Sequence, residues 1–364
     1  MCGSREAPGV SDSSTDTDAD TDAEAAADGG ADADADAGDD GPEYTVVVTD
    51  HDFADLSVER EVLDGVARVV ELSAPVGGEG PDAAGARERL AGADAVLNHR
   101  RELDAEDVAA LSDVAVIARY GIGVDNVAVE AAAEHGIPVT NVPDYCFEEV
   151  ATHALALLLA SDRGVAAYDA DVAAGGWSRA AGPEMHRLST RTAGVVGFGA
   201  IGRALGERLH ALGLDVLASD PFLADEDVPD WAALVPFEEL LERSHYVSVH
   251  SPLTEATRGM FDADAFARMR ADARLVNVAR GPVVDVDALL DALDADAIAG
   301  AALDVLPEEP PAEDHPVRTH PDVLVTPHVA WYSEEANAER RRTAAGIVRS
   351  ALLGEAVENV TNGV

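Results

Sequence analysis

The chain has 364 residues, enough for two domains, and carries 70 acidic residues against 25 basic ones, all of which are arginine. Such an excess of negative charge disfavours nucleic acid and anionic membranes as partners. Two cysteines far apart, Cys2 and Cys146, predict no disulfide framework and a reducing compartment. No run reaches the roughly 18 apolar residues of a membrane span.

The first 43 residues differ in composition from the rest. From Ser11 to Asp40 they are almost entirely Asp, Ala, Ser, Thr and Gly, so they cannot bury enough apolar surface to offset the entropy of ordering. We expect residues 1–43 to be a disordered acidic tail. No basic stretch followed by an apolar run precedes it, so we expect no secretory signal and a cytoplasmic protein.

The acidic excess does not come from the tail alone. Removing its 14 acids and Arg5 still leaves 56 acids against 24 arginines. Molar salt shortens the range of charge repulsion to about 3 Å, so this composition favours a halophilic protein.

From Tyr44 onward, short apolar runs alternate with helical patterns. The runs that we expect to form strands are Tyr44–Val48, Ala67–Leu72, Ala95–Asn98, Val114–Ala118 and Ile137–Val142. The stretches between them that we expect to be helical are Ser57–Leu63, Asp82–Ala91, Ala105–Leu111 and Val127–His135. Strands that alternate with helices imply a parallel sheet with helices on both faces.

A long apolar helix is predicted from Glu148 to about Leu159, with a pattern that continues toward Val172. A second alternating series follows, with strands expected at Arg191–Val196, Leu214–Ser219, Tyr246–His250, Arg274–Val278, Ile298–Leu303 and Val323–Thr326. The last predicted helix, Glu334–Leu353, cannot form a domain alone and should pack back onto the domain that the first series of strands forms. We therefore predict two doubly wound parallel-sheet α/β domains with a cleft between them. Residues 44–144 plus 330–364 form one domain, and residues 145–329 form the other.

The most informative motif opens the second series. The glycines of Gly197-Phe198-Gly199-Ala200-Ile201-Gly202 lie between the strand ending at Val196 and a predicted helix, Ile201–Leu212. In this arrangement the first glycine allows a tight turn, the second admits a pyrophosphate and the third lets helix and strand pack closely. Asp220, eighteen residues past the last glycine, ends the next strand and would accept hydrogen bonds from ribose hydroxyls. The pattern predicts a Rossmann domain that binds NAD rather than NADP.

Three polar residues follow successive strands in this second series. Arg280, Glu309 and His328 come after the strands that we expect to end near Val278, Leu303 and Thr326. Doubly wound sheets bind their ligands at this edge. A histidine there can donate a proton, a carboxylate stabilises and orients its protonated form, and an arginine can bind a carboxylate with a planar fork.

These motifs and their order resemble the D-isomer-specific 2-hydroxyacid dehydrogenase family over nearly everything from Tyr44 onward. The resemblance implies a flavodoxin-like substrate domain, catalysis by Arg280, Glu309 and His328, and NAD-dependent interconversion of a 2-oxo acid and a D-2-hydroxy acid. It implies no metal. The cofactor-binding residues that it implies, besides the glycine loop and Asp220, are Ser251, Pro252, Thr254, Thr257, Ala279, Arg280, Asp304 and His328.

The first domain should supply the pocket for the substrate carboxylate. Its candidate residues are Arg119, Tyr120, Gly121, Ile122 and Gly123, because glycines after a strand leave backbone N–H groups free for an anion. Together with these, His99 and Trp331 resemble the C-terminal-binding-protein branch of the family. There Trp331 would line the substrate pocket; alternatively, it only anchors the last helix.

Two further alternatives stay open. The residues Asn98-His99-Arg100-Arg101 differ from a loop common in phosphoglycerate dehydrogenases, although Arg100 and Arg101 could meet a phosphate. The same fold also serves NAD(H)-gated binding proteins. The resemblance further implies a homodimer, formed through the long helix after Glu148 and the arm that follows it.

Overall fold

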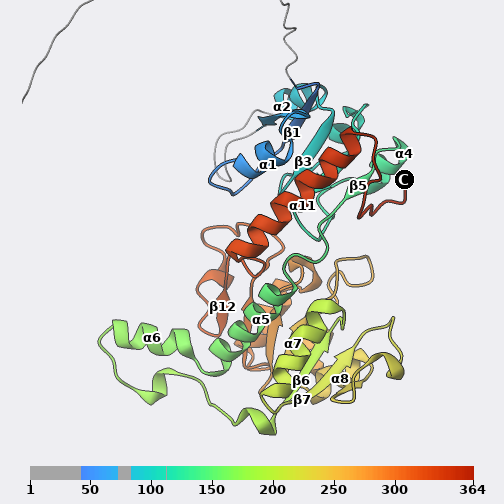
Figure 1. Cartoon of the computed structure of the whole chain (residues 1–364). Coiled ribbons are helices and arrows are strands. Elements are labelled where there is room, and N and C mark those ends of the chain that lie inside the picture. The colour runs from blue at the N-terminus through green and yellow to red at the C-terminus, as the bar shows by residue number, and fades with distance from the viewer. Residues whose placement is uncertain (1–41, 73–82, 112) are drawn as a thin grey trace, which may run out of the picture. The chain divides into compact units, whose positions relative to one another are not determined.

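The computed structural model describes residues 42–72, 83–111 and 113–364, which form two parallel sheets (Figure 1). The predicted acidic tail lies outside these residues except for its last two, and Cys2 lies outside them as well. No helix among the described residues is long and apolar enough to cross a membrane.

The first sheet has five strands in the order β2-β1-β3-β4-β5, all parallel. Its strands are β1 (Tyr44–Val48), β2 (Ala67–Glu71), β3 (Ala95–Asn98), β4 (Ile117–Arg119) and β5 (Val139–Thr140), and its helices are α1 (Ser57–Val62), α2 (Ala83–Leu90), α3 (Ala105–Ala109) and α4 (Val129–Glu134). The strand order is that of flavodoxin-like domains, as predicted. The strand expected at Val114–Ala118 begins later and includes Arg119, and the one expected at Ile137–Val142 is only two residues long.

The last helix, α11 (Glu334–Leu352), packs on this first sheet against α1, β3 and β4, and Figure 1 shows it in red across these elements. A buried ion pair at 2.6 Å between Arg341 and Glu59 joins α11 to α1. The C-terminal helix therefore returns to the first sheet. The limits 44–144 plus 330–364 and 145–329 stay a prediction.

The second sheet has seven parallel strands in the order β12-β11-β10-β9-β6-β7-β8. They are β6 (Thr192–Val196), β7 (Asp215–Ser219), β8 (Ala232–Leu234), β9 (Tyr246–Val249), β10 (Arg274–Asn277), β11 (Gly300–Leu303) and β12 (Val323–Val325). The order reverses between β6 and β9, which is the switch point where doubly wound sheets bind their ligands. The predicted Rossmann topology is confirmed; β8 was not predicted.

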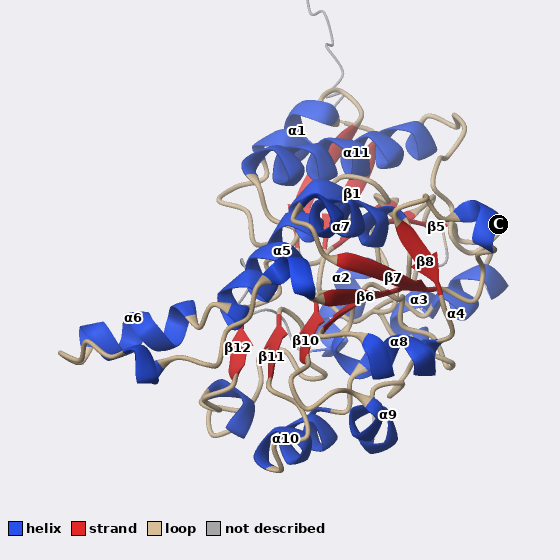
Figure 2. Cartoon of the chain, turned by 90° about the horizontal axis from the view of Figure 1, so that it is seen from below, coloured by secondary structure: helices blue, strands red, loops and turns tan. Residues whose placement is uncertain are grey.

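Neighbouring residues of a strand point to opposite sides of the sheet, so this sheet has two apolar faces, and helices cover both. Val276 and Ala302 belong to the apolar cluster under α5 (Phe147–Asp162) and α7 (Ala200–Ala211), whereas Leu275 and Leu303 belong to a second cluster. That second cluster lies under α8 (Phe237–Arg243), α9 (Ala263–Arg268) and α10 (Val286–Asp294), which Figure 2 shows on the other side of the strands from α5 and α7.

The predicted long helix is interrupted. Gly164 adopts a left-handed conformation, with φ 59°, between α5 and a separate helix α6 (Val165–Ala173). A Cβ at this position would lie 2.2 Å from Pro183, so glycine is needed both for the turn and for the close approach. The short 3-10 helices are η1 (Arg179–Ala181), η2 (Leu188–Thr190), η3 (Asp225–Asp227), η4 (Gly281–Val283) and η5 (Pro316–Arg318).

Candidate active site

The three glycines after β6 each have a distinct geometric role. Gly197 turns the chain with φ 86°, and a Cβ on Gly202 would lie 2.2 Å from the Gly197 carbonyl oxygen. A Cβ on Gly199, by contrast, would meet nothing within 4 Å. Gly197 and Gly202 are therefore needed for contacts within the protein, whereas the open space at Gly199 can admit a ligand.

The start of α7 offers unused hydrogen-bond donors at this space. Gly199 precedes the helix without a side-chain cap, and no acceptor among the described residues takes the N–H groups of Ala200, Ile201 or Gly202. Such N–H groups and the helix dipole favour a phosphate. The residues present thus fit the pyrophosphate of a dinucleotide.

Asp220 lies directly beside this loop. Its carboxylate accepts hydrogen bonds from the Phe198 N–H at 2.9 Å and from the Phe222 N–H at 3.0 Å. Each oxygen still has a lone pair for a further donor. Asp220 can therefore accept from ribose hydroxyls, and its negative charge opposes a 2′-phosphate.

The other predicted cofactor residues follow neighbouring strands. The Ser251 backbone N–H lies 2.7 Å from where a Cβ on Gly197 would stand, so the two loops touch. The Thr257 hydroxyl donates to the Pro252 carbonyl at 2.6 Å and accepts from the Thr254 N–H, which closes a tight turn after β9. Ala279, after β10, donates its N–H to the Asn277 side chain. Their roles toward a cofactor stay a prediction.

His328 and Glu309 form the predicted pair. His328 Nδ1 lies 2.7 Å from Glu309 Oε2, and the second carboxylate oxygen of Glu309 accepts the Leu306 N–H at 2.9 Å. The imidazole is thereby held through Nδ1. Nε2 has no partner among the described residues and can reach a ligand.

The charge around this pair favours ionised Glu309. Burial alone would raise the pKa of Glu309, but the hydrogen bond and charge of His328, the Leu306 N–H and the charge of Arg100 together lower it. A carboxylate that stays ionised stabilises a protonated imidazole beside it. Arg100 therefore belongs to the electrostatic surroundings of the site, and its backbone N–H donates to Asp50 at 2.8 Å.

Asp304 shapes the turn that carries His328. Its buried carboxylate accepts from the Thr326 hydroxyl at 2.6 Å and from the N–H groups of Val329 and Ala330, and its carbonyl accepts the His328 N–H at 2.8 Å. His328 itself has φ 55°, a left-handed conformation that is uncommon for any residue but glycine. Asp304 thus holds the strained conformation of the turn at His328, a role that its predicted place among the cofactor-binding residues did not suggest.

Two arginines from different sheets meet at Gly123. Arg119 Nε donates to the Gly123 carbonyl at 2.9 Å, and a Cβ on Gly123 would lie only 1.9 Å from Arg280 Nη2. Asp125, whose carboxylate is 3.1 Å from Arg280 Nε, balances part of this charge. Burial lowers the pKa of Arg119 to about 10, and the nearby charge of Arg280 also lowers it. The absence of a side chain at Gly123 is what lets the two guanidinium groups approach.

The loop after β4 also leaves donors for an anion. No acceptor among the described residues takes the N–H groups of Gly121, Ile122 or Gly123. With Arg119 beside them, these groups form a concave surface suited to a carboxylate.

Tyr120 lies differently from its neighbours in this loop. Its side chain is buried in the core and its hydroxyl donates to Glu59 at 3.1 Å. Burial raises the pKa of Tyr120 well above its ordinary value. The backbone N–H of Tyr120 donates to the Asn98 carbonyl at 2.9 Å, so neither this N–H nor the side chain is free for the predicted pocket.

His99 and Trp331 converge on a residue that the sequence did not single out, Arg340 of α11. Its guanidinium lies 3.1 Å from His99 Nε2 and 3.7 Å from the centre of the Trp331 ring. The indole N–H of Trp331 donates to the His328 carbonyl at 3.0 Å. No sequence pattern indicates that all three side chains meet, because His99 is 241 positions from Arg340.

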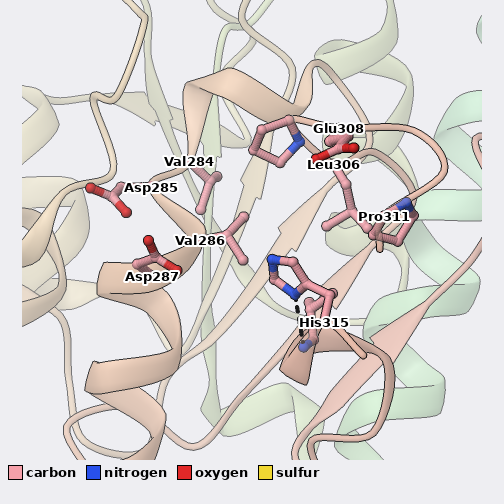
Figure 3. Close-up of a pocket in the computed structure, with 10 residues that line it drawn as sticks. Val284, Asp285, Val286, Asp287, Leu306, Glu308, Pro311 and His315 are labelled. Atoms are coloured by element: carbon pink, nitrogen blue, oxygen red, sulfur yellow. Dashed lines mark hydrogen bonds between the residues drawn. The ribbon is translucent and has the colours of Figure 1, made fainter. Parts of the chain in front are cut away.

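A surface pocket elsewhere does not contain these residues. It lies beside the N-terminus of α10, and its polar lining includes Asp285, Asp287, Glu308 and His315 (Figure 3). Three acids would repel an anionic cofactor or a carboxylate substrate. The candidate active site is therefore the set of strand ends with His328, the arginines and the glycine loop.

The fold and site together define a dinucleotide-binding α/β protein with a paired acid–base group. Residues 155–330 match the family model described as D-isomer specific 2-hydroxyacid dehydrogenase, NAD binding domain. The chain therefore belongs to the D-isomer-specific 2-hydroxyacid dehydrogenase family, and its second sheet is the NAD-binding domain of that family.

Individual relatives show how far the similarity extends. D-3-phosphoglycerate dehydrogenase 2, chloroplastic, of Arabidopsis thaliana is 40% identical over 255 residues, which are 70% of this chain and 41% of that protein. The chain spans about half the length of the curated relatives it matches.

Solved structures match over almost their whole length. The TT0316 protein from Thermus thermophilus has a TM-score of 0.78 and 30% identity, covering 87% of this chain and 99% of that one. A glyoxylate reductase from Paecilomyes thermophila has a TM-score of 0.77 and 26% identity, covering 86% of this chain and 97% of that one.

Proposed function

We propose that this protein catalyses the NAD-dependent interconversion of a 2-oxo acid and a D-2-hydroxy acid. The observation that carries the proposal is the Glu309–His328 pair, held at 2.7 Å with Nε2 of the histidine unoccupied. Bound NADH would supply the hydride. The proton transfer and the binding of the substrate would use side chains and backbone N–H groups of this chain, from both sheets.

In the direction of reduction, protonated His328 would give its Nε2 proton to the oxygen of the substrate carbonyl. Glu309 stabilises the charged imidazole before the transfer and keeps Nε2 directed outward. In the reverse direction the neutral imidazole takes the hydroxyl proton from the same position.

The arginines would orient the acid. The N–H groups of Gly121–Gly123 and the Arg119 guanidinium suit the substrate carboxylate, and Arg280, close by at Gly123, can bind the polarised carbonyl oxygen or share the carboxylate. Lysine would lack the planar fork that such a contact uses.

We further propose a preference for NAD(H) over NADP(H), because Asp220 stands beside the glycine loop. Changing Asp220 to Ser should lower kcat/KM for NADH and raise it for NADPH, because the change removes the ribose acceptor and the charge that opposes a phosphate. The measurement is kcat/KM with each cofactor at a fixed substrate concentration. A parent protein that prefers NADPH would contradict the proposal.

One observation favours a second candidate, a phosphorylated substrate. Relatives named D-3-phosphoglycerate dehydrogenase match over 68–78% of this chain, and Arg100 lies near enough to Glu309 to affect its pKa. Arg100 could bind a phosphate at the far end of such a substrate. The presence of His99 and Trp331 beside the same arginine instead supports a place in the C-terminal-binding-protein branch, which includes NAD(H)-gated binding proteins.

A substrate panel separates these possibilities. Reduction of glyoxylate, pyruvate and 4-methyl-2-oxopentanoate with NADH is compared with oxidation of D-3-phosphoglycerate with NAD⁺. Turnover of an unphosphorylated acid supports the first proposal, and exclusive turnover of phosphoglycerate supports the second. Tight NADH binding without turnover of any acid would indicate a binding protein.

We also propose that the protein forms a homodimer through α6 and the arm that follows it. No residue of α6 is buried, and Val165, Val172 and Trp177 are 56%, 49% and 90% exposed. Figures 1 and 2 both show α6 extending away from the rest of the described residues. Large apolar side chains on such a projection favour burial against a second copy.

A further inference from the structure

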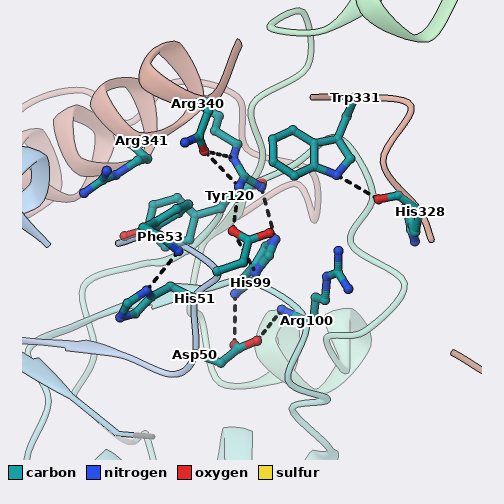
Figure 4. Close-up of polar contacts among 12 residues, drawn as sticks. Asp50, His51, Phe53, His99, Arg100, Tyr120, His328, Trp331, Arg340 and Arg341 are labelled. Carbon is teal, nitrogen blue, oxygen red and sulfur yellow. Dashed lines mark hydrogen bonds and ion pairs between the residues drawn. The ribbon is translucent and has the colours of Figure 1, made fainter. Parts of the chain in front are cut away.

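We propose that Arg340 is a positioning residue that sets the width of the substrate side-chain pocket by holding Trp331 and His99. The inference rests on the proposed function, because it assigns those two residues to the wall of a 2-oxo acid pocket. Arg340 itself is 1% exposed, so it acts through its neighbours. Figure 4 shows it beside Trp331 and His99.

On one side, Arg340 supports the indole ring. Its guanidinium carbon lies 3.7 Å from the centre of the Trp331 ring, a contact distance for a stacked cation. The same ring is tied to the catalytic loop by its N–H, which donates to the His328 carbonyl at 3.0 Å. The position of the indole is therefore fixed between the histidine and the arginine, as Figure 4 shows.

On the other side, Arg340 is held by polar groups of the first sheet. Nη2 donates to Asp52 at 2.9 Å, Nε and Nη2 donate to Asn337, and Nη1 donates to the Tyr120 carbonyl at 3.5 Å. These contacts leave the buried guanidinium well satisfied. It has little freedom to move relative to the loops after β1 and β4.

His99 is fixed by the same group. Arginine has no acceptor, so the 3.1 Å contact between Arg340 Nη1 and His99 Nε2 requires Nε2 to accept and Nδ1 to carry the proton. Nδ1 has no hydrogen-bond partner among the described residues, and its nearest carboxylate oxygen, on Asp52, is 3.9 Å away. One side chain thus sets the tautomer of His99 and the position of Trp331.

The arrangement joins two distant parts of the site. His99 follows β3 of the first sheet, whereas Trp331 follows His328 after the second sheet. Arg340 spans the gap between these pocket walls, and its planar face and five N–H donors are all used. Lysine has no planar face and fewer donors, so it cannot reproduce both contacts.

The test uses Arg340→Met, which keeps an apolar side chain of similar length. We expect the ratio of kcat/KM for 4-methyl-2-oxopentanoate to that for glyoxylate to change by about tenfold, the discrimination that pocket shape supplies for apolar groups. Arg340→Lys should not restore the ratio. Val348→Ala is the control for general destabilisation, because it creates a cavity at a buried position on the same helix, away from the site. It should leave the ratio as in the parent.

A second measurement reports on Trp331 without turnover. The chain has 3 tryptophans, so Trp177→Phe with Trp231→Phe leaves Trp331 as the sole emitter. In this background Arg340→Met should raise the acrylamide quenching constant, because the indole loses its support. In a Trp331→Ala background Arg340→Met should no longer change selectivity, since the effect passes through the indole.

The outcomes distinguish the two proposals. A parent that turns over 2-oxo acids, with unchanged selectivity in Arg340→Met, overturns the positioning role and leaves the dehydrogenase proposal intact. A parent that turns over no acid of the whole panel, D-3-phosphoglycerate included, overturns the dehydrogenase proposal, and the pocket role with it. Unchanged quenching overturns the support of Trp331 whatever the activity.

Discussion

At the scale of single residues, the site depends on side chains that control one another. Glu309 orients His328, Asp304 holds the turn on which His328 sits, and Arg340 supports the Trp331 ring beside it. Each of these supporting groups is at least partly buried, so its charge acts in surroundings that screen it poorly. Changes at these positions should therefore alter catalysis in distinguishable ways.

Replacing His328 by Ala should lower kcat by about 10²–10⁴-fold, because it removes the proton donor. NADH affinity should change little, since the glycine loop and Asp220 remain. Glu309→Gln should keep partial activity and, in the oxidation of the hydroxy acid, shift the acidic limb of the pH–rate profile, because that direction needs a neutral imidazole and the carboxylate that stabilises the imidazolium is lost. The measurements are steady-state rates from pH 5 to 9 and NADH titration by fluorescence. An active His328→Ala protein would contradict the mechanism.

A second residue-scale prediction concerns pH and stability. Burial, and next the charge of Arg340, lowers the pKa of His99 from 6.5 to about 2. Between these values the unfolded chain binds a proton that the folded protein does not. Stability should therefore fall as pH drops below about 6.5, by up to about 1.4 kcal/mol per pH unit from this residue.

Denaturant unfolding at pH 5, 6 and 7 in constant salt measures this dependence. His99→Gln should make the free energy of unfolding depend less steeply on pH, by the equivalent of up to one proton, because the glutamine cannot take up a proton on unfolding. His135→Gln, at an exposed position after α4, is the matched control. Equal slopes in the parent and His99→Gln would rule out a neutral buried His99.

At the scale of elements, Gly164 decides what the long apolar segment becomes. The left-handed turn there ends α5, which packs on the second sheet, and directs α6 away from it. No residue of α6 is therefore buried. A continuous helix would have kept the same apolar periodicity. The break therefore converts a core helix into a core helix followed by an exposed arm.

If this arm is the dimer interface, Trp177→Asp should shift the protein from dimer to monomer, because it places a charge where apolar area is buried. The expected readout is mass by sedimentation velocity at micromolar concentration in molar KCl. Phe222→Asp is the control, since Phe222 is also large, apolar and 92% exposed but lies after β7. A parent protein that is monomeric at all concentrations would end the dimer proposal.

At the scale of the whole molecule, charge dominates. The 364-residue chain has a formal net charge of −45, and its cations are all arginine. At about 0.01 M salt the Debye length is roughly 30 Å, so most of these charges repel one another. At about 1 M it is about 3 Å, and only close pairs interact.

The melting temperature should therefore rise steeply from dilute buffer to molar KCl. NADH, an anion, should bind more weakly in dilute buffer, because the field around the protein repels it. Thermal melts across a KCl series, with sorbitol at matched osmolality as the control, measure the effect. A flat or falling melting temperature would refute the prediction of salt adaptation without affecting the family assignment.

Much of the fold and the centre of the site could be predicted from the sequence. Alternating apolar runs and helical patterns indicated both parallel sheets, and the spacing from Gly197 to Asp220 indicated the Rossmann domain. Arg280, Glu309 and His328 could be singled out because parallel strands place their carboxyl ends at one edge. Each of these inferences uses a local pattern and a general rule of topology, so none required knowledge of distant contacts.

The remaining features depended on tertiary structure. Three contacts join residues that are not neighbours in the sequence. Tyr120 is buried against Glu59, and Asp304 accepts hydrogen bonds from the turn at His328. Arg340 contacts Asp52, 288 positions away. No local periodicity reveals which way such a side chain points. The contact of Arg340 with Asp52 exists because the last helix returns to the first sheet, and the other two form where segments that follow different strands pack together.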